Sequence, residues 1–156
     1  MKRLIAFALL AVCLGLCLPC QAGGAWIAVV PEAESVARDG SVGATVRLGW
    51  WDASPGFALI RVTYDAKLLT CENVEVLDSR VSSVNTAKGT LTLVYSPAAG
   101  ETADAQPGTA ETELVRITLK GVKKGNATVT PAIVSITDSR WLGISAESAP
   151  TVINVR

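Results

Sequence analysis

The sequence predicts an all-β protein, an antiparallel β-sandwich with a jelly-roll-like arrangement of about nine strands. From Trp26 onward, short runs alternate apolar and polar residues, and Gly, Pro, Asp and Asn separate these runs at fairly regular intervals. No stretch between the runs has the periodicity of an amphipathic helix. Strands that follow one another without helices pair antiparallel, and two sheets packed face to face bury one side of every strand.

Each expected strand is an alternating run that ends at turn residues. The strands are Trp26–Val30, Ser41–Trp51, Phe57–Tyr64, Leu68–Val76, Arg80–Asn85, Thr90–Tyr95, Glu113–Val122, Ala127–Thr137 and Thr151–Val155. Asp39-Gly40 and Gly125-Asn126 favour tight reversals, and Thr86–Gly89 closes a hairpin. Ser96–Thr112, rich in Ala, Gly, Thr and Pro, is predicted to be the one long loop.

Residues 1–22 have the features of a secretory signal peptide. Lys2 and Arg3 precede the apolar run LIAFALLAVCLGLCL, which is short for a membrane span, and Cys20-Gln21-Ala22 places small residues at the cleavage positions. We therefore expect residues 23–156 to form one exported domain, extracellular or periplasmic, that has no membrane segment once the signal is removed.

The composition excludes most catalytic chemistry. The chain has no histidine, which removes Ser-His-Asp and Cys-His nucleophile systems and His-containing metal sites. Its 14 acidic residues are scattered over turns and strand ends, and its 14 basic residues form no field for nucleic acid. No spacing resembles a Ca²⁺ loop, so neither an enzyme activity nor a metal or cofactor is expected on this chain.

Cys71 is the one cysteine that remains after export. A single cysteine in an exported protein can be a reactive thiol or form a bridge between two copies. It can also be a small buried apolar residue, and this is the expectation here.

Four stretches carry a resemblance to a known family. They are AWIAVVPEAESVARDGSVGATVRLGW, PGFALIRVTYDAKLLTCENVEV, GTLTLVYS, and the C-terminal part from Gly108 to Val155. Their order and spacing resemble those of cohesin modules, which receive dockerin modules in cellulosomes and related extracellular assemblies. The resemblance covers nearly all of residues 23–156. It implies a sandwich that binds a dockerin-bearing protein, with any Ca²⁺ on the partner, in an assembly that can serve polysaccharide degradation.

The third expected strand departs from the pattern of that family. In cohesins that bind dockerins well, its outward positions commonly carry Asn and Asp, whereas alignment on Tyr64-Asp65 places Phe57 and Leu59 there. Period-two alternation puts Phe57, Leu59, Arg61 and Thr63 on one face. The residues expected to face the core are Ala58, Ile60, Val62 and Tyr64. Such an apolar pair can be the centre of a protein interface, or the long Ser96–Thr112 loop can cover it. The expected partner-binding residues are Phe57, Leu59, Arg61, Thr90, Thr92 and Val94.

Two alternatives to protein docking stay open. Trp51 is expected to point outward beside an inward Trp50, and Trp141 lies in a polar turn, so both are candidates for stacking against polysaccharide. The third possibility is a structural subunit of an envelope or surface assembly without a ligand of its own.

Overall fold

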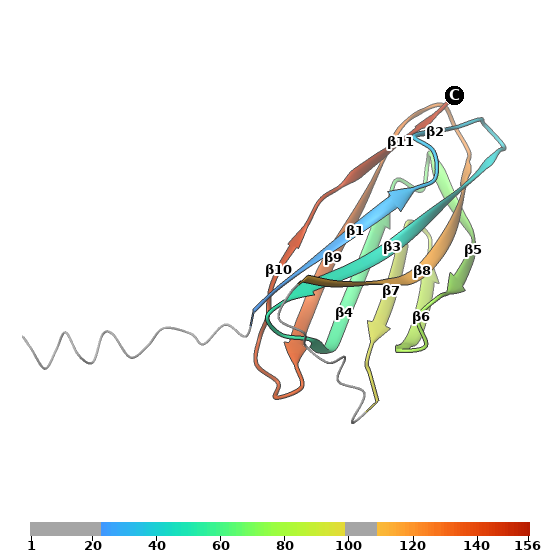
Figure 1. Cartoon of the computed structure of the whole chain (residues 1–156). Helices are drawn as coiled ribbons and strands as arrows, with labels where there is room; N and C mark the ends of the chain where they lie inside the picture. The colour runs from blue at the N-terminus through green and yellow to red at the C-terminus, as the bar shows by residue number, and fades with distance from the viewer. Residues whose placement is uncertain (1–22, 99–108) are drawn as a thin grey trace, which may run out of the picture.

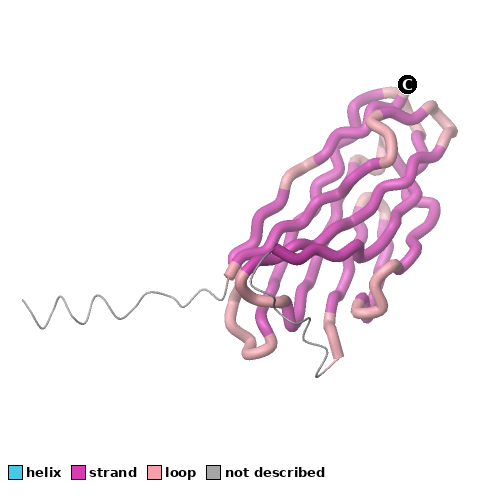
Figure 2. Tube along the Cα trace, in the orientation of Figure 1, coloured by secondary structure: helices cyan, strands magenta, loops and turns pink. Residues whose placement is uncertain are grey.

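The computed structural model describes residues 23–98 and 109–156, and there the chain is built from strands and connections (Figures 1 and 2). The predicted signal peptide, residues 1–22, lies outside the described part, as does most of the predicted long loop. Two sheets pack face to face, which confirms the predicted β-sandwich. Within the described ranges, no helical segment has the length and apolarity required to cross a bilayer.

One layer of the sandwich is a five-stranded sheet with the strand order β10-β1-β3-β8-β5. Its strands are β1 (Gly24–Pro31), β3 (Ser41–Trp51), β5 (Leu69–Val76), β8 (Thr109–Gly121) and β10 (Ser145–Ser148). β3 and β8 form its centre, and they stay paired along the whole length of β3.

The other layer is a six-stranded sheet with the strand order β2-β11-β9-β4-β7-β6. Its strands are β2 (Ser35–Val36), β4 (Pro55–Tyr64), β6 (Val81–Ala87), β7 (Thr90–Tyr95), β9 (Gly125–Asp138) and β11 (Thr151–Val155). β4 lies between β7 and β9 and is therefore paired along both edges.

The core fills the space between the two sheets because alternate residues of each strand point inward. In β4 the inward residues are Ala58, Ile60 and Val62, all 0% exposed, and in β7 they are Leu91, Leu93 and Tyr95. The facing sheet contributes the inward residues of β3 and β8, among them Leu48 and Ile117. This burial of apolar side chains is the main stabilising term of the fold.

All nine expected strands are present, but the chain also forms two short strands that the sequence pattern did not predict. β2 is two residues long, and β10 is a polar four-residue strand, so neither shows an apolar alternation. Both pair in parallel, β10 with β1 and β2 with β11, so the expectation of purely antiparallel pairing was wrong at these two edges. The chain crosses between the sheets before and after each of them, which allows a parallel neighbour.

The predicted long loop ends earlier than expected. β8 begins at Thr109, and residues 109–112 continue the ladder opposite Leu48–Trp51 at the end of β3. The assignment of residues up to Thr112 to the loop was therefore wrong. Residues 109–112 are polar or small and show no apolar alternation, so the sequence pattern did not predict a strand there. They extend β8 because they pair with the end of β3.

Candidate functional site

The outer face of the six-stranded sheet brings the predicted partner-binding residues together. Leu59 of β4 lies opposite Val94 of β7, and Arg61 lies opposite Thr92. Thr90, next along β7, lies opposite Thr63. We call the surface made by Phe57, Leu59, Arg61, Thr90, Thr92 and Val94 the β4–β7 face. It is outward-facing because the residues between them in sequence point into the core.

Leu59 lies at the apolar centre of this face. Leu59 and Val94 are cross-strand neighbours and are both partly exposed. On the other side of β4, Leu59 lies opposite Ser135 of β9, and Arg61 lies opposite Ala132. Small residues on β9 therefore leave both Leu59 and the exposed Arg61 accessible, and Arg61 forms no ion pair within the described part of the chain.

A β-bulge adds an apolar residue that sequence reasoning missed. The register of β4 against β9 shifts between Leu59 and Ile60, and Val134 is the extra residue of β9, 50% exposed. The signal in the sequence is a change of phase, because the apolar alternation of β9 occupies odd positions up to Ile133 and resumes at the even position Ile136.

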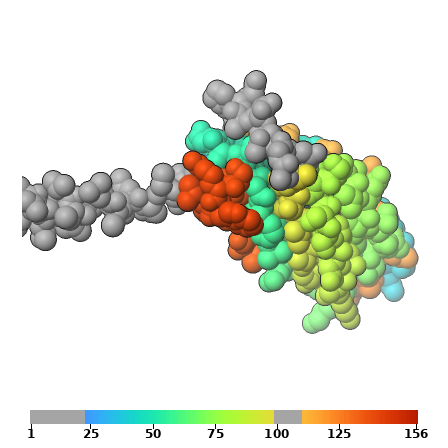
Figure 3. Space-filling view, turned by 90° about the horizontal axis from the view of Figure 1, so that it is seen from below, coloured from blue at the N-terminus to red at the C-terminus, as the bar shows by residue number. Residues whose placement is uncertain are grey.

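Trp141 closes one end of the β4–β7 face. Its ring centroid lies 6.4 Å from that of Phe57, and the two ring planes are tilted by 33°. Figure 3, the view from below, shows the red surface of the turn after β9 directly beside the green surface of β4. Trp141 has a positive φ of 64° and remains 76% exposed, and Phe57 is partly exposed beside it.

Asp138 fixes the turn that carries Trp141. Its Oδ1 accepts hydrogen bonds from the backbone N–H groups of Arg140 (2.8 Å) and Leu142 (2.9 Å), and the Arg140 side chain bonds Oδ2. Burial would raise the pKa of Asp138, but these donors outweigh it and lower the pKa. Asp138 is thus a structural residue of the turn.

The alternative in which the long loop covers Phe57 and Leu59 depends on residues 99–108, which lie outside the described part. What the structure shows is partial cover of Phe57 by Trp141. Sequence reasoning treated Trp141 as a sugar-stacking candidate together with Trp51. The structure places Trp141 beside Phe57, whereas Trp51 packs over Gly24 on the five-stranded sheet, so the two tryptophans have different surroundings.

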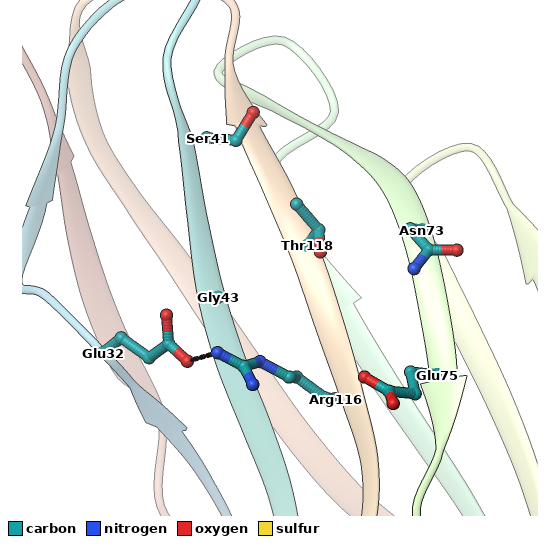
Figure 4. Close-up of a pocket in the computed structure, with 7 residues that line it drawn as sticks. All are labelled: Glu32, Ser41, Gly43, Asn73, Glu75, Arg116 and Thr118. Carbon is teal, nitrogen blue, oxygen red and sulfur yellow. Dashed lines mark hydrogen bonds and ion pairs between the residues drawn. The ribbon is translucent and has the colours of Figure 1, made fainter.

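The outer face of the five-stranded sheet has a shallow polar hollow, shown in Figure 4. Its volume is about 290 Å³, and its lining residues are Glu32, Ser41, Gly43, Asn73, Glu75, Arg116 and Thr118. The Arg116 guanidinium forms an ion pair with Glu32, and Arg116 lies opposite Glu75 in the ladder between β5 and β8. The Glu32 carboxylate lies over Gly43, in the space that a Cβ at that position would take.

In the hollow, the Ser41 hydroxyl donates a hydrogen bond to the Glu72 carboxylate at 2.7 Å, and Arg116 is engaged by Glu32. Across residues 23–98 and 109–156, no three His, Cys, Asp or Glu side chains lie together as a metal site. Apart from Gly43, the residues that line the hollow have polar or charged side chains.

Comparison with known proteins shows the fold. No family model matches the sequence, and no curated protein sequence matches it. Among solved structures, the sixth cohesin of Acetivibrio cellulolyticus scaffoldin B, in complex with a Cel5 dockerin, has a TM-score of 0.66 at 16% identity. The match covers 85% of this chain and 99% of that chain.

Two further cohesins match in the same way. The seventh ScaB type I cohesin of Pseudobacteroides cellulosolvens has a TM-score of 0.64 at 18% identity, covering 84% of this chain and 92% of that chain. A non-cellulosomal cohesin of the archaeon Archaeoglobus fulgidus has a TM-score of 0.63 at 12% identity, covering 85% and 91%. The chain therefore has the fold of cohesin modules.

Proposed function

We propose that this chain is an exported, non-catalytic binding module that docks a dockerin-type protein through its β4–β7 face. The observation that carries the proposal is the pairing of Leu59 with Val94 on the outer face of a sandwich with the cohesin fold. A similar cohesin is known in complex with a dockerin, which makes a dockerin the first class of partner to consider.

The geometry of the β4–β7 face suits protein docking. β4 is hydrogen-bonded to strands on both sides, so its outward side chains are held on a rigid surface before a partner arrives. A preorganised surface loses little conformational freedom on binding. Interface centres are rich in apolar groups and Arg, with polar residues at the rim. Leu59 opposite Val94, with Arg61 opposite Thr92, fits that composition.

The chemistry of this face defines the partner more closely. The resemblance to cohesins implies Asn and Asp at the outward positions that hold Phe57 and Leu59 in this chain. The partner would therefore present apolar side chains to Leu59 and Phe57, and a carboxylate to Arg61. Binding would depend more on buried apolar area than on hydrogen bonds from this strand.

The cellular setting is part of the same proposal. The signal-like residues 1–22 support export to the periplasm or the cell exterior. A dockerin-type partner would place the module in an extracellular assembly, and polysaccharide degradation is the process that such an assembly would serve. Any Ca²⁺ would be bound by the partner.

Isothermal titration with dockerin modules encoded by the same organism tests this proposal. Residues 23–156 are titrated as wild type, as Leu59→Asp, and as the control Thr70→Asp, which adds the same charge at an exposed position of β5. We expect Leu59→Asp to lose at least a hundredfold in affinity, and Thr70→Asp to bind as the wild type does. Circular dichroism confirms that both variants are folded.

The same titration in the presence of a chelator tests whether the Ca²⁺ is bound by the partner. We expect EDTA to abolish binding through the dockerin while the thermal unfolding of this chain is unchanged. Equal affinity of Leu59→Asp and Thr70→Asp would contradict the assignment of the β4–β7 face, and no binding to any dockerin would contradict the partner class.

A further inference from the structure

Two tryptophans lie next to each other on the outer face of the five-stranded sheet, away from the β4–β7 face. In the ladder between β1 and β3, Gly24 lies opposite Trp51, and Trp26 lies opposite Gly49. Trp26 and Trp51 are therefore diagonal neighbours on adjacent strands, and their Cβ atoms are about 7 Å apart in such an arrangement. We call this pair the Trp26–Trp51 platform.

Each indole lies over the glycine opposite to it. A Cβ added at Gly24 would come within 1.8 Å of Trp51 Cζ2 and 2.1 Å of Cε2. One at Gly49 would come within 2.1 Å of Trp26 Cε2 and 2.3 Å of its Nε1. The rings thus occupy the space that side chains would otherwise fill, and both tryptophans remain partly exposed. The inner side of each ring packs against a glycine, and the outer side faces solvent.

Exposed carboxylates flank the platform on both neighbouring strands. Glu147 of β10 lies opposite Trp26, and Glu111 of β8 lies opposite Gly49. Neither forms an ion pair with any described residue. The nearby guanidinium of Arg47 is already bound to Glu113 at 2.6 Å. The surface around the platform is therefore rich in hydrogen-bond acceptors and carries a negative charge.

We propose that the Trp26–Trp51 platform binds a neutral polysaccharide built from flat pyranose units. Pyranose rings present C–H groups on their faces, and these are attracted to the electron-rich faces of indole rings. Their hydroxyl groups donate hydrogen bonds to carboxylates such as Glu111 and Glu147. Anionic polysaccharides are disfavoured because the same carboxylates repel them.

The polar hollow extends this face along β3. Outward residues of β3 run from Trp51 and Gly49 at the platform to Gly43 in the hollow, a distance of about 20 Å for six residues of strand. A chain of several sugar units lying along β3 would reach the polar groups of the hollow. The two sheet faces would then act together, one docking a protein and the other holding a glycan.

Isothermal titration with cellohexaose, using hexagalacturonate as the anionic comparison, tests the platform. We expect cellohexaose to bind and hexagalacturonate not to bind. Trp51→Ala should weaken cellohexaose binding at least tenfold, whereas Trp141→Ala, which also removes an exposed tryptophan, should leave it unchanged. Leu59→Asp should also keep full affinity for cellohexaose, so this result is independent of the docking proposal.

A double variant provides a second test in case Trp51→Ala does not fold. Glu111→Ala with Glu147→Ala removes the flanking acceptors without removing either indole, and we expect at least threefold weaker binding of cellohexaose. Failure of the wild type to bind cellohexaose at millimolar concentration would overturn the proposal. It would be overturned equally by a Trp51→Ala variant that is folded and binds as the wild type does, or by a preference for hexagalacturonate.

Discussion

The ring of Trp141 lies against the ring of Phe57, with 6.4 Å between their centroids. The contact connects the turn after β9 to the beginning of β4, on the side of the six-stranded sheet that carries Leu59 and Val94. Because Trp141 is 76% exposed, most of its surface is available to a binding partner. It therefore extends the apolar part of the β4–β7 face toward one end of the sandwich.

Trp141→Ala should weaken partner binding by at least tenfold, because large exposed aromatic residues contribute strongly to interfaces. The stability of the domain should change by less than about 0.5 kcal/mol, since the side chain is mostly exposed. Titration with the partner and urea denaturation measure the two effects. Val122→Ala is the control, because Val122 is 41% exposed in the turn between β8 and β9. Equal losses of affinity in both variants would contradict the role of Trp141.

Gly56→Ala should destabilise the domain by about 1–3 kcal/mol through overpacking. An added Cβ at Gly56 would lie 2.7 Å from the backbone N and Cα of Ser139, which belong to the turn that carries Trp141. Gly143→Ala is the matched control, because nothing lies within 4 Å of the corresponding position. Urea denaturation should therefore separate the two variants, and coincident unfolding curves would show that the turn is free to move.

Much of the fold could be predicted from the sequence, because the alternation of apolar and polar residues along a strand indicates which side chains are buried. In β4, Ala58, Ile60 and Val62 point inward as expected and are fully buried, whereas Tyr64, expected on the same face, is partly buried against the core. The same rule correctly placed Leu59 on the outward face and Trp50 in the core. These features depend on local periodicity, and they needed no knowledge of which strands become neighbours.

The remaining features depend on contacts between distant segments. The packing of Trp141 on Phe57 follows from a turn that Asp138 fixes through hydrogen bonds, and the sequence alone does not give its direction. The sequence analysis did not select Trp26 as a binding residue, because its position beside Trp51 and over Gly49 depends on the pairing of β1 with β3. β10 has no apolar pattern and becomes a strand by pairing with β1.

Cys71 should react slowly with thiol reagents in the folded protein. Its side chain is partly buried, its Sγ donates a hydrogen bond to the Asn73 carbonyl at 3.5 Å, and burial raises the pKa of the thiol. Because the thiolate is the reactive form, we expect the reaction with DTNB at pH 8 to be at least tenfold slower than in urea-unfolded protein. Equal rates in both states would show that the thiol is accessible and activated.

Asp78 should make stability depend on pH in acid. The carboxylate is 8% exposed and accepts hydrogen bonds from Arg80 Nη2 at 2.7 Å and from the Thr112 hydroxyl at 2.6 Å. Burial alone would raise the pKa of Asp78, but these donors and the Arg80 charge outweigh it and lower the pKa from 3.8 to about 2. A carboxyl whose pKa is lower in the folded state stabilises that state above the unfolded pKa, and loses this contribution as pH falls through the folded pKa.

Asp78→Asn removes this titration and provides the test. The shift in pKa corresponds to about 2 kcal/mol of stability that is present at pH 5 and lost progressively between pH 4 and pH 2. Urea denaturation at pH 5, 3.5 and 2 should therefore show a large stability difference between wild type and Asp78→Asn at pH 5 that shrinks toward pH 2. Asp52→Asn, at an exposed position after β3, is the control for the chemical change from Asp to Asn. A stability difference for Asp78→Asn that stays constant from pH 5 to pH 2 would mean that the bonds from Arg80 and Thr112 stabilise the two protonation states equally.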